Sequence, residues 1–174
     1  NARMENRRRG FLQQLAVGRE MREREAIWYP HFLDFRGRFY PMAAGLHPQC
    51  DDAGKSLLAF ADGQRLGERG LFWLGVRLAN TYGMDKLPLK QRFEWAKDHH
   101  REIVDSAENP LDGHRFWAET DEEPWSFLVT CREWAEAHGP WEQPSEYVSH
   151  LPVQLDGSCN GLQHLSAMGR DPIG

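Results

Sequence analysis

The stretch LPVQLDGSCNGLQHLSAMG, residues 151–169, holds the sharpest pattern in the sequence. Its first five residues, 151–155, predict a β-strand. Asp156-Gly157-Ser158 then predicts a turn, and apolar residues at helical spacing predict a helix over 160–169. A carboxylate therefore stands at the junction between a strand and a helix.

This junction suits a metal ion next to a phosphate. A strand end would hold the Asp156 carboxylate rigidly, and Gly157 lets the backbone approach a ligand because no side chain intervenes. Free amides at the start of the next helix favour an anion. Mg²⁺ is usually held by one or two carboxylates together with substrate phosphates. The competing interpretation is that Asp156 only caps the following helix.

A thiol enzyme is a rival reading of the same stretch. Cys159 would lie near a helix N-terminus, where a thiol pKa can fall, and His164 would be its base. Residues five apart on a helix point about 140° away from each other. We therefore expect Cys159 to be structural and not a nucleophile.

A second candidate site lies near the N-terminus, at Asp34-Phe35-Arg36-Gly37-Arg38. In an extended segment, Arg36 and Arg38 would point to one side, where two guanidinium groups suit the phosphates of a nucleic-acid strand. Asp34 would hold one of them, and the alternative is a plain surface ion pair. Trp28 and Tyr40 suit either stacking on bases or packing in the core, and core packing is the better prior.

Helical patterns dominate the remaining sequence. They predict helices over residues 3–26, 67–82, from Pro88 to about 107, and about 123–138, with short extended pieces joined by loops over 27–50. The fold class is therefore mostly α with short strands, an α+β protein.

Composition excludes several classes of protein. The 174 residues contain 21 basic and 26 acidic side chains, a net charge of −5, which argues against a small basic nucleic-acid-binding module. Residues 1–40 nevertheless hold nine Arg against five acids, so one basic end belongs to an acidic chain. No apolar run approaches the roughly 18 residues of a membrane span. Three separated Cys argue against disulfides and against a zinc site.

Several tracts together resemble the single-subunit DNA-dependent RNA polymerases of bacteriophages and mitochondria. Residues 155–168 look like motif A of that family, and Leu33–Tyr40 resembles its Asp-Trp-Arg-Gly-Arg stretch. Gln49, residues 55–63 and Glu123-Pro124-Trp125 also resemble family segments in the expected order. The similarity covers residues 26–174. It divides the chain into an N-terminal helical segment, 1–26, and a partial catalytic domain, 27–174, with a template-contact region, a helical region and palm motif A.

The resemblance implies a right-handed polymerase fold that includes the start of the palm. Asp156 would be a catalytic, metal-binding aspartate, and Gly157 would offer its carbonyl to a metal. Arg36, Arg38 and Tyr40 would lie near the template or the RNA–DNA hybrid, and Lys55 matches a basic position near the template. The complete enzyme would use two Mg²⁺ ions and would bind a DNA template, an RNA transcript and ribonucleoside triphosphates, with no membrane partner.

The family's second catalytic aspartate, its catalytic Lys and its nucleotide-selecting Tyr lie beyond motif A, and the sequence given stops at Gly174. We therefore expect an internal fragment of a DNA-directed RNA polymerase that is inactive alone. The alternative is a non-catalytic binding or assembly domain derived from a polymerase. The tract after His164 favours a phage polymerase in the host-cell cytoplasm, with the mitochondrion as the alternative location.

Overall fold

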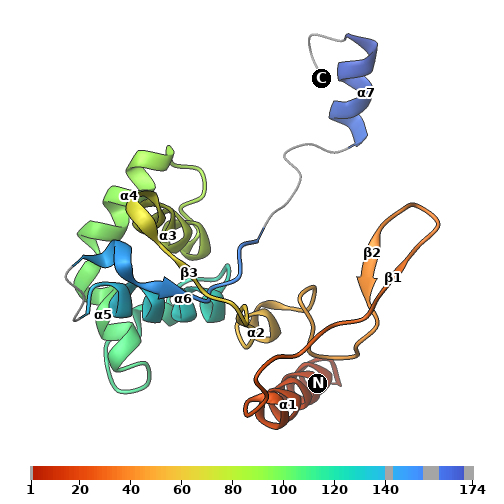
Figure 1. Cartoon of the computed structure of the whole chain (residues 1–174), viewed down its shortest axis with the longest axis horizontal. Coiled ribbons are helices and arrows are strands. Elements are labelled where there is room, and N and C mark those ends of the chain that lie inside the picture. The colour runs from red at the N-terminus through yellow and green to blue at the C-terminus, as the bar shows by residue number, and fades with distance from the viewer. Residues whose placement is uncertain (1, 140–142, 155–160, 171–174) are drawn as a thin grey trace.

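The computed structural model describes residues 2–139, 143–154 and 161–170, and its fold is mostly helical with short antiparallel strands, as expected. Its N-terminal part contains a long helix, a β-hairpin and a short helix (Figure 1). These are α1 (Ala2–Met21), β1 (His31–Leu33), β2 (Phe39–Pro41) and α2 (Asp52–Lys55). Helix α1 confirms the first predicted helix and ends five residues earlier than the predicted boundary.

Four longer helices form the main body of the molecule. They are α3 (Gly67–Tyr82), α4 (Leu89–Asp98), α5 (His100–Glu108) and α6 (Pro124–Ala137), with 3₁₀ turns η1 (Phe116–Ala118) and η2 (Pro144–Glu146). Helix α6 packs against both α3 and α5, and α4 packs along α3. The predicted helices over 67–82 and 123–138 are confirmed. Gly83, which follows α3, ends it in the left-handed region at φ 102°, where glycine is favoured.

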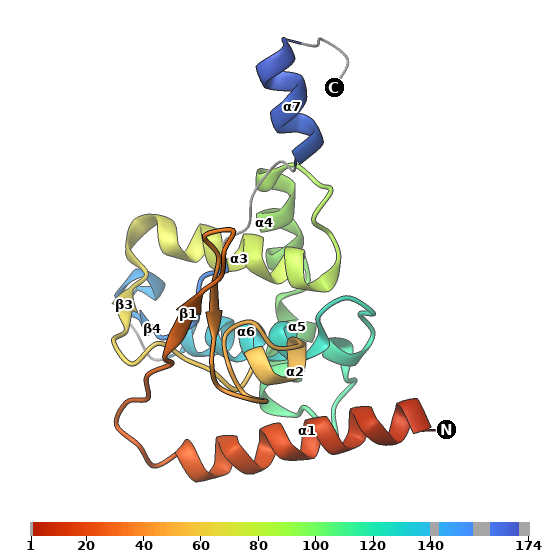
Figure 2. The ribbon, with the colours of Figure 1, turned by 90° about the vertical axis from the view of Figure 1, so that its right-hand side faces the viewer.

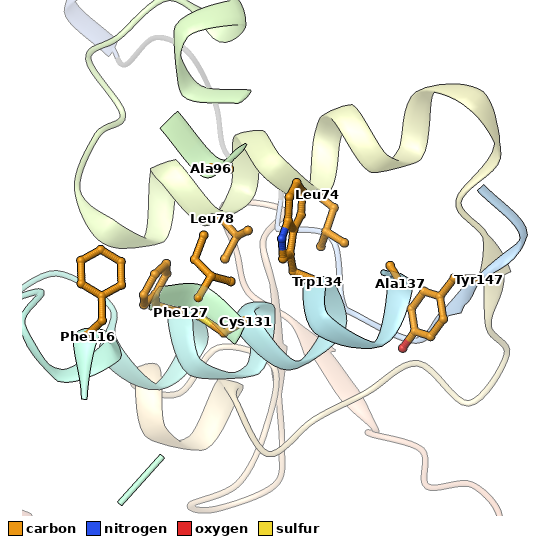
Figure 3. Packing of buried hydrophobic residues seen from close by; sticks show 10 residues of the cluster. Leu74, Leu78, Ala96, Phe116, Phe127, Cys131, Trp134, Ala137 and Tyr147 are labelled. Carbon is orange, nitrogen blue, oxygen red and sulfur yellow. The ribbon is translucent and has the colours of Figure 1, made fainter. Parts of the chain in front are cut away.

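One apolar core joins these helices (Figure 3). Phe127 and Cys131 of α6 are fully buried against Leu78 of α3 and Ile103 of α5. Burial of this kind removes the Cys131 thiol from water and raises its pKa. The remaining members of the cluster are Leu74, Ala96, Phe116, Trp134, Ala137 and Tyr147. The stripe at i, i+3 and i+4 spacing that predicted these helices is therefore the face that forms the core.

The predicted helix from Pro88 to 107 is in fact two helices, broken at His99. His99 has φ −98° and ψ 19°, outside the helical region, and it is shared by the end of α4 and the start of α5. Its ring Nδ1 lies 2.8 Å from the Trp95 carbonyl oxygen, and the ring stacks on Trp95 at a centroid distance of 4.5 Å. These contacts hold the chain at the break, which hydrophobic spacing alone does not reveal.

The predicted strand over 151–155 is wrong for residues 151–154, and Leu155 lies outside the described residues. Strand pairing occurs just before it, where β4 (Val148–Ser149) pairs antiparallel with β3 (Gln64–Arg65). Pro152 has no N–H to donate to a ladder. Its carbonyl oxygen instead accepts a hydrogen bond of 2.9 Å from Nη1 of Arg77. A side chain therefore takes the place of a partner strand.

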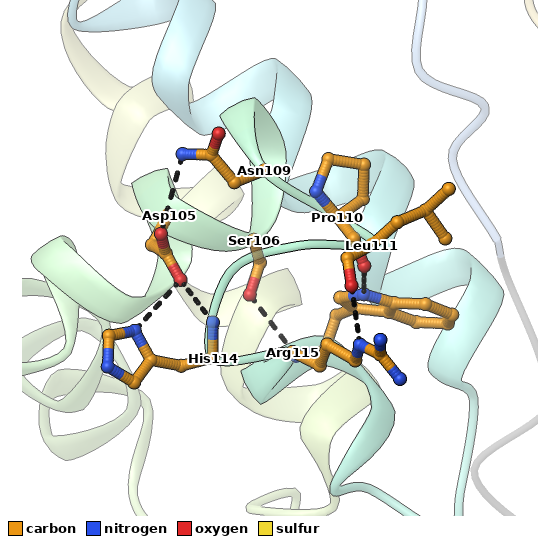
Figure 4. A network of polar contacts seen from close by, with 8 residues as sticks. Asp105, Ser106, Asn109, Pro110, Leu111, His114 and Arg115 are labelled. Atoms are coloured by element: carbon orange, nitrogen blue, oxygen red, sulfur yellow. Dashed lines mark hydrogen bonds and ion pairs between the residues drawn. The ribbon is translucent and has the colours of Figure 1, made fainter.

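The loop after α5 is fixed by Asp105 (Figure 4). Its carboxylate accepts hydrogen bonds from the backbone N–H of His114, at 2.8 Å, and from Asn109. The hydrogen bond from the His114 amide is the main reason that the Asp105 pKa lies below its usual value. Gly113 passes so close that an added Cβ would lie 2.6 Å from the Asp105 carboxylate. The loop therefore follows one path back to η1 and the core.

The Asp52 carboxylate links the N-terminal part to the helical core. Asp52, the first residue of α2, accepts hydrogen bonds from the amides of Trp125 (2.8 Å) and Ser126 (3.0 Å) at the start of α6. Helix α6 has no cap from the side chain next to its own start. Phe11 of α1 also stacks on Trp125 at a centroid distance of 5.6 Å. Helices α1 and α2 are thus both held at the N-terminal end of α6.

Helix α7 (Gly161–Gly169) lies apart from the other elements (Figure 2) and confirms the helix predicted over 160–169. Three of its side chains, Leu162, Leu165 and Met168, are exposed. No helix in the described part of the chain is long and apolar enough to cross a membrane.

Trp134 is buried to 1% exposure, and its indole N–H has one acceptor, Nδ1 of His100, at 3.0 Å. Only a neutral His100 with a bare Nδ1 can accept this bond. Burial, and then the nearby ring of His138, lower the His100 pKa. Folding therefore favours the neutral imidazole.

We expect Asp52→Ala to lower the free energy of unfolding by about 1–2 kcal/mol, the usual cost of losing a helix cap. Urea denaturation followed by circular dichroism measures this loss. Asp62→Ala is the matched control, because Asp62 is exposed and lies in a turn. A loss no larger than that of Asp62→Ala would contradict the role given to Asp52.

A second prediction concerns pH. The folded-state pKa of His100 is lowered. The stability that neutral His100 gives through its bond from Trp134 is therefore complete above the unfolded pKa of about 6.5, and it is lost as the pH falls towards the folded value. His100→Asn keeps an acceptor that does not titrate. Its free energy of unfolding should therefore fall less than that of the wild type below about pH 6.5. Equal slopes of the free energy of unfolding against pH for the wild type and His100→Asn would refute this account.

Candidate nucleic-acid interface

The hairpin β1–β2 presents the first group of predicted site residues. Its register pairs Phe32 with Tyr40 and Leu33 with Phe39, and the turn between the strands spans residues 34–38. The backbone N–H of Asp34 donates to the Arg38 carbonyl at 2.9 Å and closes the turn. Gly37 has φ 76°, a conformation that side chains other than glycine rarely adopt. The Arg-Gly-Arg sequence is therefore the tip of a hairpin.

The Asp34 carboxylate organises this tip. Its Oδ1 accepts hydrogen bonds from the backbone N–H groups of Arg36 and Arg38, each at 2.9 Å, and its Oδ2 accepts one from Nε of Arg36 at 2.9 Å. The amide of Arg38 is the largest cause of a lowered Asp34 pKa, and the bonds from Arg36 add to it. The carboxylate therefore stays ionised and keeps the turn closed.

Arg36 and Arg38 are both exposed at the tip, but their side chains make different contacts. The Arg36 guanidinium bonds Asp34 and also donates from Nη2 to the Tyr40 hydroxyl at 2.9 Å. Arg38 uses its backbone in the turn, and within the described residues its guanidinium has no hydrogen-bond or ion-pair partner. The prediction that Asp34 holds one of the two arginines is confirmed, and that arginine is Arg36. The reason given for same-side placement is wrong, because Arg36 lies in a turn and not in an extended segment.

Aromatic side chains surround the tip. Trp28 is 84% exposed, so the core packing preferred for it is wrong. Tyr40 is half-buried, with its ring 5.7 Å from that of Phe32. Phe35, next to the arginines, is 98% exposed. The tip thus combines two guanidinium groups with exposed rings, which is typical of surfaces that bind nucleic-acid strands.

Lys55 is the last residue of α2 and lies away from the hairpin tip in sequence. Asp51 caps this short helix by accepting from the Gly54 N–H at 3.0 Å, and it accepts a second bond from Nε2 of Gln14 in α1 at 3.0 Å. The half-buried Lys55 side chain lines a large cleft beside α1. Among the described residues its ammonium group has no hydrogen-bond or ion-pair partner.

Sequence reasoning missed Arg77, which lines the same cleft from α3. Arg77 directly precedes Leu78 and follows Leu74 by three residues, so it interrupts the apolar stripe of α3. A cation on the buried face of a predicted helix was the available signal, since such a position normally requires a partner or a ligand.

The predicted metal ligands Asp156 and Gly157 lie outside the described residues, as does Cys159. Among the residues that are described, no three His, Cys, Asp or Glu side chains are grouped to hold a metal ion. The two described cysteines, Cys50 and Cys131, are free thiols.

The family model and the similar proteins that match this chain are all DNA-dependent RNA polymerases. The model of the DNA-dependent RNA polymerase family matches residues 64–174. The chain is 46% identical over 163 residues to DNA-directed RNA polymerase 1, mitochondrial, of Nicotiana sylvestris, and 46% identical over 161 residues to the mitochondrial DNA-directed RNA polymerase of Neurospora crassa. It is 45% identical over 173 residues to the mitochondrial DNA-directed RNA polymerase of Mus musculus.

These alignments cover 92%, 92% and 98% of this chain. They cover only 16%, 11% and 14% of the three relatives, so the chain spans a small part of their length. The relatives are mitochondrial, and they lend no support to the phage origin favoured from the sequence.

Proposed function

Because the chain belongs to the single-subunit DNA-dependent RNA polymerase family, we propose that it forms part of the catalytic domain of a DNA-directed RNA polymerase. That enzyme is a nucleotidyltransferase that adds ribonucleotides from ribonucleoside triphosphates to an RNA 3′ end on a DNA template. The observation that carries the proposal is the identity of 45–46% over at least 92% of the chain. The mitochondrial relatives support a mitochondrial-type polymerase located in the mitochondrion.

The family membership supports assigning a role to each part of the chain. Residues 1–26 form the N-terminal helical segment, and 27–174 contribute the template-contact region, the helical region and the start of the palm. The hairpin tip binds the backbone of the template or of the RNA–DNA hybrid through Arg36 and Arg38, with the Tyr40 hydroxyl holding Arg36 in place. Lys55 adds a cation near the template.

Asp156 and Gly157 would hold Mg²⁺ through a carboxylate and a backbone carbonyl, and oxygen ligands of this kind are those that Mg²⁺ prefers. In the complete enzyme a pair of Mg²⁺ ions held there would supply activation of the RNA 3′ hydroxyl and stabilisation of the leaving pyrophosphate. The chain's own contribution is to position the carboxylate. Just before it, the β3–β4 pair and the Arg77–Pro152 hydrogen bond fix the polypeptide to the helical core.

The hairpin assignment predicts a change in salt dependence. Arg36→Ala or Arg38→Ala in the whole polymerase should weaken binding of a labelled RNA–DNA hybrid and reduce the slope of log K against log salt by about one per lost phosphate contact. Fluorescence anisotropy at several salt concentrations measures both quantities. Arg101→Ala, on the exposed surface of α5, is the control of equal charge. A slope unchanged in both hairpin variants would favour a purely local ion pair with Asp34.

The metal assignment predicts a separation of binding from chemistry. In the whole polymerase, Asp156→Asn should reduce nucleotide incorporation by about 100-fold or more, as does the loss of other groups that stabilise charge in a transition state. Hybrid binding should persist. Asp62→Asn, at an exposed turn, should retain incorporation. Incorporation by Asp156→Asn within a few-fold of the wild type would show that Asp156 is not a metal ligand. If the unaltered polymerase binds the hybrid but incorporates no nucleotide, the non-catalytic alternative is favoured.

A further inference from the structure

The chain that leads towards Asp156 is held by side chains beyond the end of its strand. Strand β4 lies beside β3 (Figure 2), and their pairing ends at Ser149. Leu151 and Pro152 lie past that point, and Asp156 follows Pro152 by four residues in the sequence. Half-buried backbone groups that have no partner strand need other hydrogen-bond partners. The path of this segment therefore depends on the side chains that supply them.

The Ser149 hydroxyl supplies the first of these partners. Its Oγ accepts a hydrogen bond of 3.1 Å from the backbone N–H of Leu151 and donates one of 2.6 Å to Oε2 of Glu133 in α6. A hydroxyl has a single proton, so a Ser149 that donates to the carboxylate offers only lone pairs to Leu151. A hydrogen bond from a hydroxyl to a carboxylate is also shorter and stronger than one between neutral groups. Glu133 therefore orients the hydroxyl that holds Leu151.

Arg77 supplies the second partner, on the next residue. Its Nη1 donates to the Pro152 carbonyl oxygen at 2.9 Å. Burial is the main influence on the Arg77 pKa, which it lowers, and the carboxylates of Glu123 and Glu133 oppose that shift. The charge of Glu133 thus favours the ionised guanidinium that bonds Pro152. One glutamate of α6 therefore supports both contacts beyond the strand.

The other contacts of the segment lie before this point. Glu136, one turn after Glu133 in α6, accepts a hydrogen bond of 2.8 Å from the hydroxyl of Tyr147, a member of the buried cluster. The backbone N–H of Phe60 donates to the His150 carbonyl oxygen at 2.8 Å. Of the two glutamates, Glu133 is the one whose bond reaches, through a serine, past the end of the strand pairing.

We propose that Glu133 is a positioning residue for nucleotide incorporation, which acts through Ser149 to set the path of the chain from β4 to Asp156. The inference rests on the proposed function, since it requires Asp156 to be the metal-binding carboxylate. Groups of a catalytic site must be held to within about 0.5 Å of their productive positions, and a displacement of about 1 Å can reduce the rate about 100-fold. Glu133 itself is assigned no contact with metal or substrate.

The test measures kcat and KM of nucleotide incorporation by the whole polymerase. Glu133→Met removes the acceptor with little change in side-chain length and should lower kcat about tenfold, while the nucleotide KM and the hybrid affinity stay within about twofold of the wild type. Glu133→Gln keeps an oxygen that can accept the Ser149 proton, so its kcat should stay within about threefold of the wild type. Ser149→Ala should match Glu133→Met, and the double variant should be no slower than either, because both changes break the same pair of hydrogen bonds.

Ser106→Ala separates positioning from a general loss of stability. The Ser106 hydroxyl also accepts a backbone N–H, that of Trp117 at 3.2 Å, but it lies in α5 and is fully buried. The variant should unfold at a lower urea concentration than the wild type and keep kcat within about twofold. A loss of kcat equal to that of Ser149→Ala would overturn the inference. If circular dichroism shows that Glu133→Met is unfolded, Ser149→Ala carries the test, because it removes only one oxygen atom.

Hydrogen exchange gives a readout that needs neither metal nor nucleotide. Mass spectrometry of a peptide that contains Leu151 should show its amide exchanging about tenfold faster in Glu133→Met and Ser149→Ala than in the wild type, because its acceptor is lost or no longer oriented. The same amide should exchange at the wild-type rate in Ser106→Ala. An unchanged rate in Glu133→Met would overturn the inference, and so would faster exchange with an unchanged kcat.

Asp156→Asn distinguishes failure of this inference from failure of the proposed function. If Asp156→Asn loses incorporation and Glu133→Met keeps it, the metal assignment stands and only the positioning role of Glu133 falls. If Asp156→Asn incorporates nucleotides like the wild type, the metal assignment falls, and the positioning role falls with it whatever the exchange rate of Leu151.

Discussion

The Asp52 carboxylate is the contact on which the arrangement of the molecule depends. It accepts hydrogen bonds from two amides at the start of α6, a helix whose other residues form the centre of the core. The helix start gains an ionised acceptor, which is favourable next to its positive dipole end. Because Asp52 begins α2, this bond also fixes Lys55 three residues later, and the Phe11–Trp125 stacking fixes α1 beside the same helix end. The same contact therefore caps α6, packs α2 against the core and positions Lys55.

This arrangement explains how an acidic chain can present two basic surfaces. The hairpin tip projects away from the helical core (Figure 1), and its arginines are ordered locally by Asp34. The cleft beside α1 is instead assembled from segments far apart in sequence, so its cations converge only when α1 and α2 are held at α6. The acidic residues that give the chain its negative charge lie mostly on the exposed faces of other elements, as Glu94, Glu102 and Glu108 do.

Predictions from the sequence were accurate where residues close together in the sequence determine the structure. The helix over 67–82 follows from its leucine stripe, and the Asp34–Arg36 pair follows from residues two apart. The predictions failed where contacts between residues far apart in the sequence determine the structure. His99, where α4 ends, stacks on Phe116 of η1. Pro152 is held by Arg77, which lies 75 residues away in the sequence. Trp28 was expected in the core, yet it is exposed on the segment before the hairpin. Neither Arg77 nor the cleft has a local motif, since both depend on how α1, α3 and α6 meet.

The central claim is that the α2–α6 contact makes the N-terminal part and the helical core a single rigid unit. Residual dipolar couplings of backbone amides in weakly aligned, isotope-labelled protein test it most directly. One alignment tensor should fit the couplings of α1 and α2 together with those of α3 and α6. Two tensors of different magnitude or orientation, one for each part, would show that the parts reorient independently and would contradict the account.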